Sequence, residues 1–166
     1  MSNYLTFDNR LEIQQGLKQQ LSFGKIAEAI GKDRTTVAKE IKKYAYEQKT
    51  GCSSYPYNAC IHRKTCTKKN VCPLECTTPS KYKCSICKLC NDVCDDFQEE
   101  VCSHRNKPPY VCNGCTDHSR CTLKKLIYDA EDAHLLCQSR LSESRSGILC
   151  NELELARINA LVTPLV

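Results

Sequence analysis

The stretch Ser22-Phe-Gly-Lys-Ile-Ala-Glu-Ala-Ile-Gly-Lys-Asp-Arg-Thr-Thr-Val-Ala-Lys-Glu-Ile-Lys-Lys43 decides the fold of the first part of this chain. Ser22 and Asp33 are residue types that cap the first turn of a helix, and each precedes a short apolar pattern. Gly31 between them allows a sharp turn, and the small side chain of Ala27 lets two helices cross closely. The stretch therefore predicts the two helices of a helix-turn-helix.

A further helix is predicted upstream of this stretch. Apolar residues recur at near-helical spacing from Leu11 to Leu21, and either Thr6 or Asp8 is available as the N-cap. The segment 1–50 is therefore predicted to be a three-helix, helix-turn-helix domain.

The last of these helices has two distinct faces. Val37, Ile41 and Tyr44 share one face, and a rotation of about 100° per residue puts the basic and small polar side chains on the other. Such a surface suits the major groove, with Lys39 near a base edge and the later lysines near phosphates. The alternative is a bundle whose lysines are only solvated. The candidate DNA-binding residues are Arg34, Thr35, Thr36, Ala38, Lys39, Lys42 and Lys43.

The cysteines are concentrated in the middle of the chain. Of 15 cysteines among 166 residues, none lies in 1–51 and thirteen lie between Cys52 and Cys121. This segment, 51–121, has little periodicity and five of the six prolines, so it cannot bury enough apolar surface to fold unaided. No signal-peptide core or membrane-spanning run is present, which predicts a cytoplasmic protein without a membrane partner. Dense cysteine in a reducing compartment indicates metal rather than disulfides.

Zinc is the predicted metal, because thiolates are strong zinc ligands and structural sites use four of them. Thirteen cysteines predict two to three structural ions, with the pairing of ligands left open. His62, His104 and His118 could each replace a cysteine, although a lone histidine near such a site is more often a bystander. The main candidate ligands are Cys84, Cys87, Cys90, Cys94, Cys102, Cys112, Cys115 and Cys121. Less certain candidates are Cys52, Cys60, Cys66, Cys72 and Cys76.

An iron–sulfur cluster is the competing interpretation of these cysteines. The run from Cys84 to Cys94 has the C-x2-C-x2-C-x3-C spacing of bacterial ferredoxins. Asp95 stands where a proline usually follows, and a second run of this kind is absent from the sequence. A redox sensor is therefore the third functional hypothesis.

Helical periodicity returns in the segment 122–166. A helical face is predicted from Leu126 to Leu141, followed by an interruption at Ser142–Gly147 and a last helix from about Asn151 to Val162. The predicted fold class is therefore mainly α, with a helix-turn-helix, an irregular cysteine-rich zinc module and C-terminal helices. The segment 122–166 is the predicted start of a possible second helix-turn-helix.

Several motifs give the chain a resemblance to a known family. The segments Leu5–Ile13, Ile26–Ala27 with Gly31, and Thr36–Ile41 resemble the N-terminus of insertion-sequence transposases of the family numbered thirty. So do Lys107-Pro-Pro-Tyr-Val-Cys-Asn-Gly-Cys115, Cys121-Thr-Leu-Lys, Ile127-Tyr-Asp-Ala130 and Leu141-Ser-Glu-Ser-Arg145. The likeness covers essentially the whole chain and is greatest to the cysteine-rich Firmicute members.

The resemblance implies double-stranded DNA as the partner, specifically the terminal inverted repeats of a mobile element, and a possible homodimer. It also implies a following catalytic domain in which two Asp and a Glu bind Mg²⁺. This chain ends before such a domain, so we expect it to bind DNA without cutting it. The acids from Asp92 to Glu100 lie too close together in sequence for that role. The net charge of +5 permits DNA binding without requiring it. The alternative function is a zinc-stabilised transcription regulator.

Overall fold

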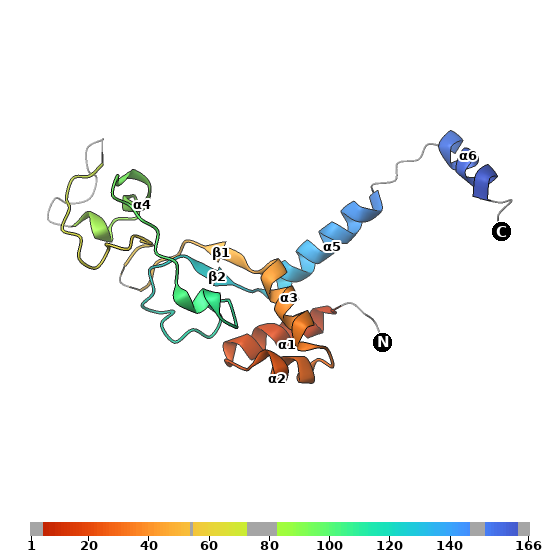
Figure 1. The fold of residues 1–166 in the computed structure, drawn as a ribbon, viewed down its shortest axis with the longest axis horizontal. Helices are drawn as coiled ribbons and strands as arrows, with labels where there is room; N and C mark the ends of the chain where they lie inside the picture. Colours follow the sequence, from red (N-terminus) through yellow and green to blue (C-terminus); the bar gives the residue numbers. More distant parts are fainter. Residues whose placement is uncertain (1–4, 54, 73–82, 147–151, 163–166) are drawn as a thin grey trace.

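The computed structural model describes residues 5–53, 55–72, 83–146 and 152–162. Helices dominate it, which confirms the predicted class, and three of them form a compact bundle near the N-terminus (Figure 1). The helices are α1 (Phe7–Lys18), α2 (Phe23–Ala29), α3 (Arg34–Tyr44), α4 (Cys90–Val93), α5 (Ala130–Ser146) and α6 (Glu152–Val162). The strands are β1 (Tyr46–Gln48) and β2 (Lys125–Ile127), and 3-10 turns occur at Cys84–Ile86 and Ser103–Asn106.

The three N-terminal helices begin where the sequence predicts. Thr6 and Asn9 form a capping box on α1, in which each side chain binds the other's backbone N–H. The Ser22 hydroxyl accepts from the Lys25 amide at the start of α2, and the Asp33 carboxylate accepts from the Thr35 amide at the start of α3. Gly31 has φ +63°, so the turn between α2 and α3 uses the left-handed conformation that glycine adopts without strain.

The core of the bundle includes residues from far along the chain. Val111, Tyr128 and Ala133 join the apolar side chains of α1, α2 and α3 in one buried cluster. Tyr128 and Ala133 are completely buried. The remaining members of the cluster are Ile13, Leu17, Ile26, Ala27, Val37, Ile41 and Tyr44. Contacts therefore join the predicted segments 1–50, 51–121 and 122–166.

A two-stranded antiparallel ribbon connects the bundle to the rest of the molecule (Figure 1). It pairs Tyr46 with Ile127, Glu47 with Leu126 and Gln48 with Lys125. The prediction that Leu126 and Ile127 belong to a helix is therefore wrong. Residues 125–127 form a strand because they pair with β1, and this pairing outweighs the local helical periodicity of the sequence.

Helix α5 begins after this ribbon and packs against α1. The Asp129 carboxylate accepts hydrogen bonds from the Glu131 and Asp132 amides and so caps the helix. The predicted interruption from Ser142 is wrong up to Ser146, because α5 continues to that residue. Residues 147–151, which include Cys150, lie outside the described part of the chain. The last helix is confirmed as α6.

The described residues between 52 and 121, which we call the arm, contain little regular structure. Two asparagines connect its loops: Asn58 is buried and donates to the Ser85 carbonyl, and Asn91 accepts from the Ala59 amide and donates to the Tyr57 carbonyl. Side chains that bind backbone groups thus replace much of the hydrogen bonding that helices or strands would supply. Among the described helices, none is long and apolar enough to cross a membrane.

Candidate nucleic-acid interface and metal sites

Helix α3 presents a polar, basic face opposite its buried face. Val37 and Ile41 are completely buried, whereas Lys39, Lys42 and Lys43 are exposed. Arg34 and Thr35 are exposed too, and Thr36 and Ala38 are half-buried at the edges of this face. The predicted placement is confirmed, and the roles of these residues in binding DNA stay predictions.

A buried ion pair fixes α3 against α1. The Arg10 Nε donates to Glu40 Oε1 at 2.6 Å, and both side chains are less than one-tenth exposed. The Tyr128 hydroxyl lies 3.4 Å from the same oxygen. Burial, and then the charge of Glu40, raise the pKa of Tyr128, so its hydroxyl keeps its proton and donates. These contacts hold the orientation of α3 relative to the rest of the bundle.

Aromatic rings hold two of the exposed lysines of α3. The Lys42 ammonium lies 4.1 Å from the centre of the Tyr110 ring, and the Lys43 ammonium lies 5.0 Å from the Tyr44 ring. Tyr110 belongs to the arm, so this contact joins the arm to one side of α3. Cation–π contacts of this kind restrict the two lysines without neutralising their charge.

The segment Tyr110–Cys115 of the arm is seated directly on the bundle. Val111 enters the core, and the Asn113 side chain donates to the Tyr128 carbonyl at 2.8 Å and accepts from the Tyr128 amide at 2.9 Å. Gly114 has φ +71°, and a Cβ there would lie 2.5 Å from the Leu17 carbonyl oxygen. Gln20 donates to the Gly114 carbonyl at 2.6 Å. This turn therefore requires glycine, both for its conformation and for its close approach to α1.

Five thiols of the arm line one open cleft of about 820 Å³; Cys66 is one of them, and the other four are Cys112 and the three thiols whose charges act on it. Backbone hydrogen bonds position Cys112 and Cys115. The Cys115 amide donates to the Cys112 carbonyl, and the Leu126 amide donates to the Cys112 sulfur at 3.4 Å. Burial first, and then the neighbouring thiols, raise the pKa of Cys112, while the Leu126 amide opposes this rise. We call these four thiols the first thiol group: Cys102, Cys112, Cys115 and Cys121.

A second set of thiols lies around Cys90, further along the arm. Burial, and then the charge that adjacent thiols would carry, raise the pKa of Cys90 to about 12. These thiols come from separate segments of the arm. An antiparallel bridge between Cys60 and Glu99 brings two of these parts of the arm together. We call these thiols the second thiol group: Cys60, Cys66, Cys84, Cys90 and Cys94.

The chemistry of both groups fits zinc, because each supplies at least four thiols. Within residues 5–53, 55–72, 83–146 and 152–162, however, no three Cys, His, Asp or Glu side chains converge in a metal-holding arrangement. Cys52, Cys72 and Cys87 are half-buried, and Cys76 lies outside the described residues. In that part of the chain no disulfide is formed by the arm's cysteines.

Several acidic side chains of the arm are paired with cations. Asp96 accepts from Lys68, Glu100 accepts from Arg63, and Glu99 lies 2.8 Å from the Lys124 ammonium. The hydrogen bond from Lys68 holds the pKa of Asp96 below its ordinary value, and that from Arg63 does the same for Glu100. These carboxylates act as structural partners within the arm.

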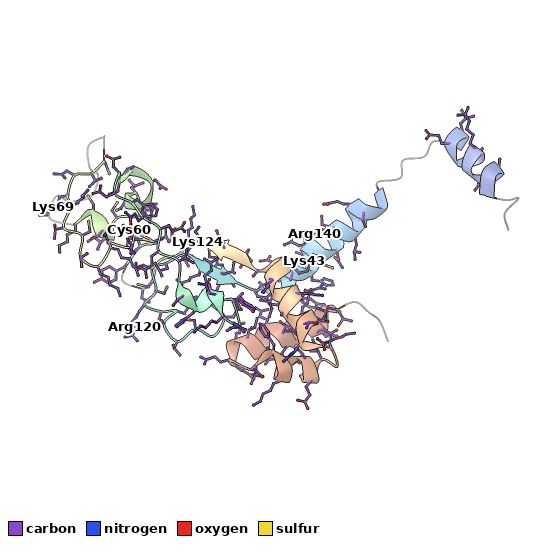
Figure 2. The ribbon with its side chains drawn as sticks, in the orientation of Figure 1. Lys43, Cys60, Lys69, Arg120, Lys124 and Arg140 are labelled. Atoms are coloured by element: carbon purple, nitrogen blue, oxygen red, sulfur yellow. The ribbon has the colours of Figure 1, made fainter. Side chains whose placement is uncertain are left out.

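Sequence reasoning missed three features of this surface. The asparagine bonds of the arm, the contact of Tyr110 with Lys42, and the position of Arg140 beside α3 each join residues distant in sequence. In Figure 2 Arg140 and Lys43 lie close together at the bundle, whereas Lys69 and Cys60 lie far along the arm. The spacing of residues along the chain does not predict such contacts.

A family model described as a helix-turn-helix domain matches residues 3–43. No curated protein and no solved structure matches the chain. The match coincides with α1, α2 and α3, whose geometry is described above, and a helix-turn-helix domain indicates DNA binding.

Proposed function

We propose that this chain is the DNA-binding N-terminal part of a transposase, which recognises the terminal inverted repeats of a mobile element during transposition. One observation supports the proposal that the chain binds DNA. The exposed basic face of α3 lies opposite the completely buried Val37 and Ile41, within the domain that the helix-turn-helix family model matches. The transposase part rests on the sequence resemblance of Leu5–Ile13, Thr36–Ile41 and Lys107–Cys115.

Within this proposal α3 enters the major groove. Lys39 points away from the core near the middle of the helix and contacts a base edge, with guanine O6 and N7 as the acceptors. Lys42 and Lys43 lie a turn later and contact phosphates. A base contact carries sequence preference, whereas a phosphate contact strengthens binding to any duplex.

The test begins by selecting tight-binding sequences from a pool of randomised duplexes. We expect one motif to be enriched, and Lys39→Ala to weaken binding to it by roughly 1–3 kcal/mol with little effect on random DNA. Lys43→Ala is the matched control, because it should weaken both DNAs alike and lower the salt slope by about one. Failure to enrich any motif, or equal effects of both substitutions on both DNAs, would contradict specific recognition by α3.

The selected motif then separates a transposase from a transcription regulator. A transposase motif should match inverted repeats that flank the gene, with a D-D-E catalytic frame nearby. A regulator motif should instead lie in promoters without such repeats. Genomic sequence around the gene, compared with the selected motif, decides between the two.

We further propose that this chain has no catalytic activity of its own. The pairing of Asp96, Glu99 and Glu100 with Lys68, Lys124 and Arg63 supports a structural role for these acids. With Mg²⁺ or Mn²⁺, the purified chain should neither nick nor join duplexes that carry the selected motif. Metal-dependent cleavage by a preparation free of nucleases would contradict this proposal.

Zinc is the proposed structural metal, with one ion for each thiol group. Cys102, Cys112, Cys115 and Cys121 would hold one ion, and four of the five thiols of the second group would hold the other. Two ions fall within the two to three that the cysteine count predicts. Because Cys60 lies outside the ferredoxin-like run, its place near Cys90 supports zinc over an iron–sulfur cluster held by that run.

Elemental analysis of the purified chain tests the metal directly. We expect about two zinc ions per chain, a colourless protein, and the loss of one ion in Cys115→Ser. Iron together with a brown colour would favour the redox sensor, and metal-free protein with an intact fold would rule out a structural metal.

A further inference from the structure

Three cationic side chains surround the ring of Tyr44 at the C-terminal end of α3. The guanidinium carbons of Arg10 and Arg140 lie 5.7 Å and 5.4 Å from the ring centre, and the Lys43 ammonium lies 5.0 Å from it. The three residues come from α1, α5 and α3 respectively. Three separate elements thus bring positive charge to one aromatic ring, and Figure 2 shows two of these residues, Lys43 and Arg140, near each other at the bundle.

These three cations differ in how their charge is balanced. Arg10 is buried and paired with Glu40. Lys43 and Arg140 are exposed, and neither has a carboxylate within ion-pair distance in the part of the chain that the structure describes. On the same helix as Arg140, Glu143 accepts a hydrogen bond from Ser139. Two neighbouring positive charges repel one another, so an anion placed beside both would be stabilised.

The position of Arg140 is fixed by the seat of α5 on the bundle. The Ala130 amide donates to the Gln14 side chain at 3.0 Å, and Gln14 in turn donates to the Asp129 carboxylate at 3.0 Å. Ala133 is completely buried against the core. Arg140 follows about two helical turns later, on the same continuous helix. Its charge is therefore placed beside α3 by a rigid element.

We propose that Arg140 and Lys43 bind the phosphate backbone of the same DNA duplex that α3 reads, so that α5 forms a flank of the DNA-binding surface. This inference rests on the proposed DNA-binding function and extends it to a helix outside the matched domain. The occupant is a duplex backbone because both charges adjoin the exposed basic face of α3. Arg140 contributes affinity and positioning, since phosphates carry no direct sequence information.

The experiment measures binding of the full chain to the selected duplex and to a random duplex of about 30 base pairs, at several salt concentrations. Arg140→Gln keeps most of the side-chain stem over Tyr44 and removes the charge. Losing one phosphate contact should lower the salt slope by about 0.9, which corresponds to roughly fivefold weaker binding at 0.15 M salt. Both duplexes should be affected equally.

Two further variants control this measurement. Arg140→Lys keeps the charge and should stay within about twofold of the unmodified chain, with the same salt slope. Arg120→Ala removes an exposed arginine of the arm, which Figure 2 places well away from Arg140, and should leave both duplexes bound as before. Circular dichroism at the assay temperature should show an unchanged helical signal for all three variants.

The outcomes separate this inference from the proposed function. If the unmodified chain selects a motif but Arg140→Gln binds both duplexes with unchanged affinity and slope, the role of α5 is wrong and DNA binding stands. If Arg140→Lys loses as much as Arg140→Gln, the effect is not that of charge, and the inference fails. If the unmodified chain binds neither duplex, the inference and the proposed function fail together.

Discussion

The bundle and the arm are each stabilised by a different kind of interaction. The bundle buries a continuous apolar cluster that includes Ile13, Leu17, Ile41 and Tyr128. Apart from Val111, which belongs to the bundle's core, the buried apolar residues of the described arm are Ala59 and three thiols, and asparagine side chains join its loops. Apolar burial stabilises a fold without a ligand, whereas an arm of this composition depends on cross-links. We therefore expect the two regions to respond differently to removal of the proposed metal.

Metal removal is the strongest way to test this contrast. With a chelator, the arm should lose its protection from hydrogen exchange throughout 52–121, because the proposed zinc ions would supply much of its folding free energy. Helices α1 to α3 should stay helical, since their core is apolar, but they should melt at a lower temperature. The physical reason is that Val111 and Asn113 of the arm are seated on the bundle.

Hydrogen exchange followed by mass spectrometry, with and without chelator, checks both halves of this prediction. Adding zinc back should restore protection in the arm. Unchanged exchange in the arm would contradict a structural metal, and complete loss of helix in 5–44 would contradict an independently stable bundle.

The next largest effect is expected from Tyr128, a completely buried aromatic residue of the bundle's core. Tyr128→Ala should lower the free energy of unfolding by about 3–5 kcal/mol, because it empties a completely buried site in the core and removes the hydroxyl beside Glu40. Urea unfolding monitored by circular dichroism measures the change. Leu135→Ala on the exposed side of α5 is the matched control and should stay within about 0.5 kcal/mol.

The junction between the two regions can be broken at a single glycine. Gly114→Ala should destabilise the chain by about 2–4 kcal/mol, since alanine is disfavoured at φ +71° and its Cβ would collide with α1. Gly24→Ala serves as the comparison, because Gly24 lies in α2 and has only the Ser22 hydroxyl near its Cβ position, at 3.8 Å. That change should stabilise the chain by up to about 1 kcal/mol. Equal thermal melting temperatures for the two variants would show that the arm does not seat on α1 as described.

The smallest effect is expected at the surface ion pairs between the ribbon and the arm. Glu47 accepts from Arg105 at 3.2 Å and lies 3.4 Å from the Lys124 ammonium. Burial alone would raise the Glu47 pKa, but these two cations outweigh it and hold the pKa below its ordinary value. The contribution to stability is therefore present at neutral pH and is lost as the pH falls through the folded pKa.

Because Glu47 is about half exposed, solvent screens this contribution to below about 1 kcal/mol. Glu47→Gln should therefore lower the melting temperature slightly at pH 7 and not at all near pH 3. The difference should also shrink in high salt. A large effect at pH 7 that persists in high salt would show that Glu47 does more than form surface pairs.

The sequence by itself determined the local structure of the bundle, and it predicts the chemistry of the arm. Thr6, Ser22 and Asp33 cap their helices through hydrogen bonds to amides within three residues, so the signal lies within a few positions. The exposed side of α3 follows from helical rotation alone, which is why the predicted positions of Lys39 and Lys43 are confirmed. The cysteine count predicts a metal because thiol chemistry needs no knowledge of the fold.

Tertiary structure decided everything that depends on pairs distant in sequence. Residues 125–127 form a strand because β1 lies beside them. Tyr128, which follows the arm in the sequence, completes the bundle's core. The division of the thiols into two groups and the place of Arg140 beside Tyr44 depend on how chain segments approach one another. Helix capping and periodicity report interactions between near neighbours, whereas packing brings together residues whose spacing along the chain carries no signal.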